Sequence, residues 1–209
     1  MSLPHIALSL SLLAAPASPP PAPAPAPAPT ERVYAKPLPE GVHAAGEYYA
    51  ARGGSTWRYA SGKERPTLSV TSVENWTAHV SISWGKRSTT AAWRVKDGAW
   101  LERSGSHPGT EIVFLPAQLQ VGTRWKGPSS IERNGKDDST FEVLATDATV
   151  EADQTYDKCL AVLETPASGG SPLTHFYAPN IGKVGVKGDG DEWVLKLVEY
   201  RAGRHVNGD

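Results

Sequence analysis

The sequence predicts an all-β protein, an antiparallel, strongly curved open sheet or incomplete barrel of about eight to eleven strands. Apolar and polar residues alternate with a period of two over much of the chain, which is typical of half-buried antiparallel strands. Turn dipeptides separate these stretches, and no alternation of strands with helices indicates a parallel sheet. A two-sheet β-sandwich is the alternative, and either fold leaves room for at most one short N-terminal helix.

The first residues of the 209-residue chain resemble an export signal. Residues 6–15 form an apolar run of the length of a signal-peptide core, too short to span a bilayer. Ala15 and Ala17 supply the small residues of a cleavage site, so we expect residues 1–17 to be removed. Positive charge before the run is limited to the amino terminus and His5. The expected location is the bacterial periplasm or the exterior, as a soluble protein.

Residues 18–32 are rich in alternating alanine and proline, which favours an extended polyproline II spacer. A ligand for a proline-binding module is the alternative interpretation of this segment. We expect a single all-β domain over residues 33–204 and a disordered tail at 205–209.

Composition excludes several classes of function. The net charge is −1, from 21 basic and 22 acidic residues, and no basic stripe indicates nucleic acid as a partner. Cys159 is the single cysteine, so neither an intramolecular disulfide nor a cysteine-based zinc site is expected. No later segment is long and apolar enough for a transmembrane helix.

The alternation assigns faces to several strands. Ala78, Val80, Ile82 and Trp84 are predicted to share one face, as are, near the C-terminus, Trp193, Leu195 and Leu197. Residues 159–163 are apolar throughout, which indicates a strand covered on both faces or a buried helix. The turn dipeptides are Ser61-Gly62, Asp97-Gly98, Asn134-Gly135, Gly169-Gly170 and Asp189-Gly190.

Helical signals are few. Residues 41–51 could hold one short helix closed by Gly53, and residues 115–119 could form a single turn. Residues 54–58 and 122–126 share a pattern of a glycine turn followed by a tryptophan and a basic residue. Two related halves would produce this echo, and so would chance.

The acidic cluster Asp189, Asp191 and Glu192 resembles part of a calcium loop but lacks its remaining ligands. Its glycines separate two strand-like stretches, so we expect a hairpin turn with Asp189 and Gly190 at positive φ, and no metal site.

Seven tryptophans suggest a sugar-binding or apolar ligand face. Trp84, Trp93 and Trp193 share faces with aliphatic residues and are expected in the core. Trp76 and Trp100 lie near turns, so these two are the candidate ligand-binding residues.

No catalytic set emerges from the sequence. Ser106 and His107 are adjacent in a turn-like segment without nucleophile-elbow spacing, and Cys159 lies in an apolar strand where a thiol is inert. The histidines are scattered, and the paired carboxylates lie near turns. We therefore expect neither an enzyme nor a cofactor.

Three stretches, "EYYAARGGSTWRY" from Glu47, "LPAQLQVGTRW" from Leu115 and "FYAPNIGKVGVK" from Phe176, resemble motifs of TapB-like small exported bacterial β proteins. In the first motif Ala50-Ala51 replaces Pro-Leu, and in the third Asn180 replaces a glycine. The resemblance implies a periplasmic or secreted all-β domain without assigned activity, and it identifies no catalytic residue.

The expected function is a non-enzymatic binding or structural module of the cell envelope. A concave sheet lined with aromatic residues could hold an apolar ligand, by analogy with the lipoprotein carriers LolA and LolB. A carbohydrate-binding module is the alternative, and a hydrolase without a recognisable motif is the third hypothesis. The expected partner is a lipid or a glycan of the envelope.

Overall fold

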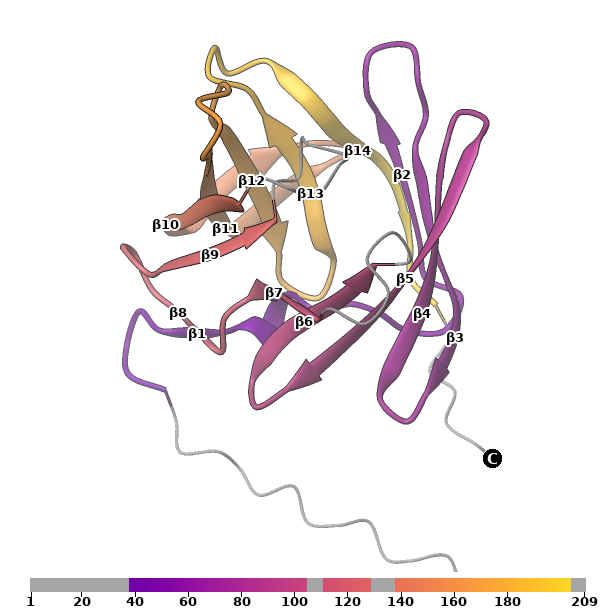
Figure 1. The fold of residues 1–209 in the computed structure, drawn as a ribbon, viewed down its shortest axis with the longest axis horizontal. Coiled ribbons are helices and arrows are strands. Elements are labelled where there is room, and N and C mark those ends of the chain that lie inside the picture. Colours follow the sequence, from indigo (N-terminus) through magenta and orange to yellow (C-terminus); the bar gives the residue numbers. More distant parts are fainter. Residues whose placement is uncertain (1–37, 105–110, 129–137, 204–209) are drawn as a thin grey trace, which may run out of the picture. The chain divides into compact units, whose positions relative to one another are not determined.

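A computed structural model describes residues 38–104, 111–128 and 138–203 (Figure 1). The predicted signal peptide, its cleavage site, the spacer, the tail, Ser106-His107 and the turn Asn134-Gly135 lie outside the described residues. The elements are β1 (His43–Ala44), η1 (Ala45–Tyr48), β2 (Thr56–Ala60), β3 (Thr67–Glu74), β4 (Thr77–Trp84), β5 (Arg87–Lys96), β6 (Ala99–Ser104), β7 (Ile112–Leu115), β8 (Gln118–Leu119), β9 (Arg124–Pro128), β10 (Asp138–Glu151), β11 (Thr155–Pro166), β12 (Leu173–Ala178), β13 (Gly182–Lys187) and β14 (Trp193–Arg201).

The main sheet confirms the predicted all-β, curved and incompletely closed architecture. Its 12 strands are all antiparallel, in the order β7-β6-β5-β4-β3-β2-β14-β13-β12-β11-β10-β9. Each strand pairs with its neighbour in sequence, except where β14 returns beside β2, as Figure 1 shows. The sheet is a nearly closed barrel with one unsealed seam, and it has more strands than we expected. Within the described residues, no helix is long and apolar enough to cross a membrane.

The seam lies between the two edge strands, β7 and β9. These edges approach closely without a hydrogen-bonded ladder. A Cβ atom placed on Gly127 of β9 would lie 3.7 Å from the carbonyl oxygen of Val113 in β7. Pro128 at the end of β9 has no N–H to donate, and proline in a sheet is confined to edges or strand ends.

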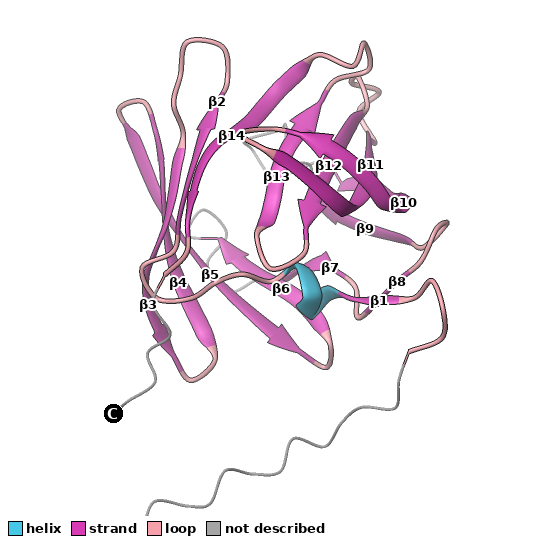
Figure 2. Cartoon of the chain, turned by 180° about the vertical axis from the view of Figure 1, so that it is seen from behind, coloured by secondary structure: helices cyan, strands magenta, loops and turns pink. Residues whose placement is uncertain are grey.

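The predicted helix over residues 41–51 is wrong in extent. Only one short 3₁₀ turn, η1, forms, drawn in cyan in Figure 2. The Glu47 carboxylate accepts the backbone N–H of Ala44 at 3.0 Å and so closes the start of this turn. Tyr49 is already extended, and the carbonyl of Glu47 accepts the N–H of Asn180, so the helix does not continue.

The single turn predicted at residues 115–119 is also wrong. Leu115 ends β7, and Gln118–Leu119 form the strand β8 instead. β8 pairs antiparallel with β1 in a separate two-stranded sheet, with His43 opposite Leu119. The backbone groups that a helical turn would have used internally are therefore committed to this long-range pairing.

The echo between residues 54–58 and 122–126 is a real structural repeat. Gly54 and Gly122 both have positive φ, of 82° and 85°. Gly54 donates to the carbonyl of Val70, whose own N–H donates to Ser55, and Gly122, Val143 and Thr123 repeat this pattern. β2 to β7 and β9 to β14 thus form two runs of six strands, here called the N-terminal and the C-terminal half-barrel.

The predicted strand faces are largely confirmed. Ala78 and Val80 are buried, with Ile82 and Trp84 half-buried on the same side, whereas His79 is exposed. Residues 159–163 belong to a strand, β11, and Cys159 through Val162 are all buried, as expected of a strand covered on both faces.

Candidate functional site

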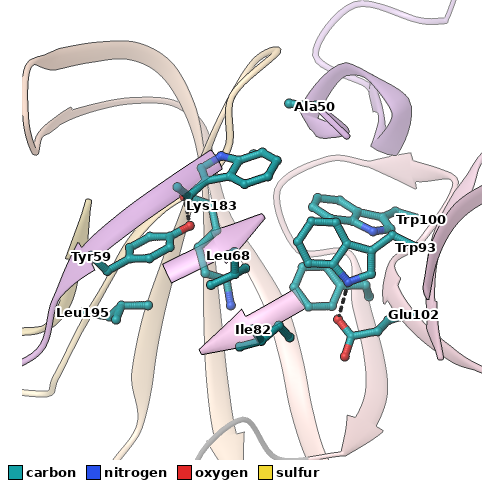
Figure 3. Close-up of a pocket in the computed structure, with 12 residues that line it drawn as sticks. Ala50, Tyr59, Leu68, Ile82, Trp93, Trp100, Glu102, Lys183 and Leu195 are labelled. Atoms are coloured by element: carbon teal, nitrogen blue, oxygen red, sulfur yellow. Dashed lines mark hydrogen bonds between the residues drawn. The ribbon is translucent and has the colours of Figure 1, made fainter. Parts of the chain in front are cut away.

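The interior of the curved sheet contains a pocket of about 160 Å³. Half-buried aliphatic side chains form part of its boundary, and buried aromatic rings form its wall (Figure 3). The lining residues are Ala50, Trp57, Tyr59, Leu68, Ile82, Trp93, Trp100, Glu102, Phe114, Gly182, Lys183 and Leu195. Most of them come from the N-terminal half-barrel, and Gly182, Lys183 and Leu195 come from the C-terminal one.

Two aromatic side chains of β2 are anchored to the backbone around β13. Trp57 Nε1 donates to the carbonyl of Ile181 at 2.6 Å, and the Tyr59 hydroxyl donates to the carbonyl of Lys183 at 2.8 Å. Both side chains point inward because they occupy alternate positions of β2, and the intervening Arg58 is exposed. These bonds hold the aromatic wall against the strand that carries Lys183.

The rest of the wall is a chain of rings in edge-on or tilted contact. The Trp93 ring lies 6.1 Å from that of Trp57 and 5.4 Å from that of Trp100, measured between centroids. Trp100 also contacts Phe114, at 4.7 Å. Aromatic pairs in such tilted arrangements stabilise each other beyond the burial of their surface, so these ring contacts stabilise the wall.

Glu102 supplies a carboxyl group to the pocket. It lies directly opposite Trp93 in the β5–β6 ladder, and Trp93 Nε1 donates to its Oε2 at 2.8 Å. Burial raises the pKa of Glu102 above its usual range, while the Trp93 hydrogen bond and Lys183 act in the opposite direction. The protonated carboxylic acid is therefore more populated than in an exposed glutamate.

Lys183 enters the interior because β13 carries an irregularity. A register shift between Phe176 and Tyr177 places Lys183 opposite Tyr177, whose side chain is buried. The Lys183 ammonium lies 5.1 Å from the Phe114 centroid and 5.4 Å from the Tyr177 centroid. Such cation–π contacts compensate part of its lost hydration.

The environment of Lys183 alters its protonation. The side chain is half-buried and keeps some contact with solvent, while protein atoms surround its ammonium group closely. Burial lowers the pKa of Lys183 to about 8, against the opposing influence of Glu164 and Glu102. A substantial fraction of the neutral amine is therefore present near neutral pH.

A buried polar chain continues from Lys183 into the C-terminal half-barrel. Lys183 Nζ lies 3.2 Å from Nδ1 of His175, whose Nε2 lies 2.7 Å from Oε2 of Glu164. Ser139 donates to the other carboxylate oxygen of Glu164 at 2.8 Å. His175, Glu164 and Ser139 are each 2% exposed or less.

This geometry assigns the tautomer of His175. A carboxylate can only accept, so Nε2 carries the proton and Nδ1 offers its lone pair to Lys183. Burial and the neighbouring Lys183 lower the pKa of His175 to about 4, in spite of Glu164. The imidazole is therefore neutral near neutral pH.

The two predicted ligand-binding tryptophans differ in exposure and in their relation to the pocket. Trp76 is 88% exposed, at the turn between β3 and β4, and takes no part in the pocket. Trp100 is only 2% exposed, so the expectation that it is freer than the other tryptophans is wrong. The neighbouring Asp97-Gly98 turn suggested an exposed ring. However, Ala117 packs closely against Gly98, and the rings of the wall cover this end of the hairpin. Trp100 nevertheless lines the pocket.

The predicted common face of Trp193, Leu195 and Leu197 is wrong for Trp193. A register shift in the β13–β14 ladder places Trp193 opposite Lys187 and Leu195 opposite Val186. The half-buried Trp193 ring packs over Gly185, 6.3 Å from Phe176 and 5.0 Å from the Lys187 ammonium. Leu195 instead lines the pocket, while Trp93 is buried as expected.

The acidic cluster at residues 189–192 forms the turn of a β-hairpin, as predicted. β13 and β14 flank it as antiparallel partners, and Lys187 Nζ donates to Asp191 at 2.6 Å. The positive φ of 63° falls on Asp191 rather than on Asp189 and Gly190, which corrects the expected turn geometry. Over residues 38–104, 111–128 and 138–203, no three His, Cys, Asp or Glu side chains are grouped to hold a metal ion.

The polar residues of the interior were not predicted from the sequence. Glu164 shares its strand face with Leu160 and Val162, and this charged residue at an inward position was a usable signal. In the same way, His175 shares a strand face with the buried residues Leu173 and Tyr177. Lys183 gave no such signal, because only the register shift turns it inward.

Comparisons with known proteins give no family. No family model matches the chain, and no solved structure matches it. A ribosomal RNA small subunit methyltransferase G from Verminephrobacter eiseniae is 54% identical over 35 residues, which are 17% of this chain and 15% of the methyltransferase. So short a match carries no activity to this chain, and the TapB-like resemblance stays a hypothesis.

Proposed function

We propose that the protein is a non-enzymatic binding module that holds a small apolar ligand inside its curved sheet. The carrying observation is the pocket of about 160 Å³, walled by Trp57, Trp93 and Trp100. An engineered apolar cavity of about 150 Å³ is large enough to bind benzene. A ligand with one ring or a short branched chain fits this volume, whereas a full acyl chain exceeds it.

The place of action in this proposal is the bacterial cell envelope. It follows from the apolar run at residues 6–15, the small residues up to Ala17 and the alanine-proline spacer. The TapB-like resemblance supports the same compartment. A small apolar molecule of the envelope, or the apolar end of a larger one, is then the expected ligand.

Calorimetric titration of the protein with toluene tests the binding proposal. We expect saturable binding that Leu68→Phe weakens by at least about tenfold, because the larger side chain fills the half-buried rim of the pocket. Val73→Phe is the matched control, since Val73 lies on the same strand but is 42% exposed and outside the pocket. Absence of saturable binding, or equal binding by the Leu68 variant, would contradict the proposal.

A carbohydrate-binding module is the second candidate, favoured by one observation. Trp76 presents an 88% exposed indole at the tip of the β3–β4 hairpin, where a flat ring can stack on a sugar. Retention of the protein on insoluble peptidoglycan tests it. Loss of retention in Trp76→Ala, in a protein that shows no saturable toluene binding, would support this function in place of the first one.

A further inference from the structure

We propose that the pocket captures a small aldehyde or ketone as a reversible imine on the Nζ atom of Lys183. This inference rests on the proposed binding function and names the chemical class of its ligand. The protein is then a covalent but reversible carrier, which takes up and releases one carbonyl compound without turnover.

The first support is the position of the amine. Lys183 extends among the lining side chains, with Tyr59 and Leu195 on one side and Trp93 and Glu102 on the other (Figure 3). The side chain keeps solvent contact although protein surrounds its ammonium group. An apolar carbonyl compound in the pocket would therefore have its reactive carbon near a lysine amine.

The second support is the partner of the amine. Within the described part of the chain, Lys183 forms no ion pair with a carboxylate, and its hydrogen bond goes to the neutral Nδ1 of His175. Glu164 in turn orients His175 through Nε2. His175 therefore holds the amine in place through a lone pair and adds no negative charge that would keep it protonated.

The protonation state agrees with this role. At pH 7, roughly one Lys183 side chain in ten carries the neutral amine, against roughly one in three thousand at the ordinary pKa of 10.5. Lysines desolvated in apolar pockets form imines for this reason. The ammonium releases its proton to solvent, which the half-buried side chain still contacts.

Glu102 supplies the acid that imine formation needs. The lone pair of Nζ attacks the carbonyl carbon, and the carbonyl oxygen takes up a proton from the nitrogen to give a carbinolamine. The carboxylic acid of Glu102 then protonates the hydroxyl, the C–O bond breaks and water leaves. The products are the protonated imine, one water molecule and the Glu102 carboxylate as counterion, so atoms and charge balance.

The test traps the imine in the full-length chain. Protein is incubated with benzaldehyde and sodium cyanoborohydride at pH 7, and the benzylated lysines are mapped by peptide mass spectrometry. We expect Lys183 to be modified at least about tenfold faster than Lys187, because its amine is more often neutral and the pocket concentrates the aldehyde. Benzyl alcohol, which fits the pocket but forms no imine, should suppress the modification of Lys183 alone.

Variants sharpen this test. Lys187→Met is the matched control, since Lys187 lies on the same strand and also stands over aromatic rings, those of Phe176 and Trp193, but outside the pocket. Its modification pattern at Lys183 should be unchanged. Glu102→Gln should slow modification of Lys183 by at least about tenfold, more than any change it causes in the affinity for benzyl alcohol can explain.

The outcomes separate this inference from the binding proposal. Saturable benzyl alcohol binding without preferred modification of Lys183 overturns the imine and leaves the binding function standing. Equal modification of Lys183 and Lys187, or modification that benzyl alcohol does not suppress, likewise overturns the imine. If benzyl alcohol and toluene both fail to bind, the binding function and the imine fall together. The mapping of modified lysines on the wild-type protein decides these cases even if a variant does not fold.

Discussion

The two half-barrels follow one strand plan but fill their interiors differently. The N-terminal half-barrel places Trp57, Trp93 and Trp100 inside, while the C-terminal half-barrel places Glu164 and His175 at inward positions. The first interior is held by ring contacts, and the second by a chain of hydrogen bonds. The difference teaches that one backbone arrangement can enclose packed aromatic rings in one half and hydrogen-bonded polar side chains in the other. The pocket with Lys183 lies where the two meet.

The half-barrels also join differently at their two ends. β14 pairs with β2 through a ladder that includes Leu197 opposite Tyr59, both of them buried. The equivalent junction, β7 with β9, lacks such a ladder. Pro128 removes one donor from the β9 edge, which favours an open edge at that place. The repeat is therefore closed at one junction and interrupted at the other.

The largest expected effect comes from removing a ring of the N-terminal half-barrel. Trp100→Ala should destabilise the protein by about 3–5 kcal/mol, because the side chain is 2% exposed and packs against Tyr49, Trp93 and Phe114. Denaturant unfolding measures this change. A Trp100→Ala protein as stable as the wild type would show that the packed rings do not stabilise the N-terminal half-barrel.

The next effect concerns the polar half and its pH dependence. The pKa of His175 is about 4 in the folded protein and near 6.5 in the unfolded chain. Between these values the unfolded chain binds a proton that the folded protein does not, so stability falls as pH falls from about 6.5 to 4, by on the order of 3 kcal/mol.

Denaturant unfolding of wild type and His175→Gln across this pH range checks the expectation. The variant keeps a donor for Glu164 but cannot titrate, so its stability should change less with pH. Comparing the two slopes removes the contribution of Glu102, whose raised pKa acts in the opposite sense. Parallel curves for the two proteins would contradict a neutral buried imidazole.

A smaller effect is expected for Trp193, on the face of the C-terminal half-barrel that bears Gly185 and Lys187. Trp193→Ala should cost about 1–2 kcal/mol, less than a fully buried tryptophan, because the ring is half-buried and flanked by the ammonium groups of Lys187 and Lys196. Thermal unfolding of the two single variants, Trp100→Ala and Trp193→Ala, gives the ranking. A larger loss for Trp193 would restore the original expectation that it belongs to the core.

The alternation of residues predicted the fold class because burial on one face of an antiparallel strand follows a period of two. It located the inward side of β4 through Ala78 and Val80, and the turn at Asp97-Gly98. It failed at Trp193 and Lys183, because register shifts reverse faces there, and no local pattern marks a shift. The site depends on such long-range pairing, so the only clues in the sequence were Glu164 and His175, two polar residues at inward positions of apolar strands.

The smallest expected effect compares equivalent hairpins of the two halves. The turn between β3 and β4 has Asn75 and Trp76 at φ values of 48° and 62°, in the left-handed region that tight two-residue turns require. The equivalent turn between β10 and β11 closes through a bond from the Ala152 N–H to the Gln154 carbonyl, and none of residues 152–154 has positive φ. At this position the hairpin of the N-terminal half-barrel thus carries strain that the equivalent hairpin of the C-terminal half-barrel avoids.

Trp76→Gly should remove this strain, because glycine adopts positive φ without steric cost. The indole is 88% exposed, so little buried surface is lost, and we expect a gain in stability of about 0.5–1 kcal/mol. Trp76→Ala is the control, since alanine also lacks the indole but keeps a Cβ atom in the strained conformation, and its stability should stay within about 0.5 kcal/mol of the wild type. Thermal unfolding of the three proteins measures these changes. A stabilised glycine variant beside an unchanged alanine variant means that the exposed tryptophan occupies a position where it lowers stability. Such a pattern is expected of a residue that is retained for contact with a ligand. A destabilised glycine variant would instead show that the indole supports the hairpin.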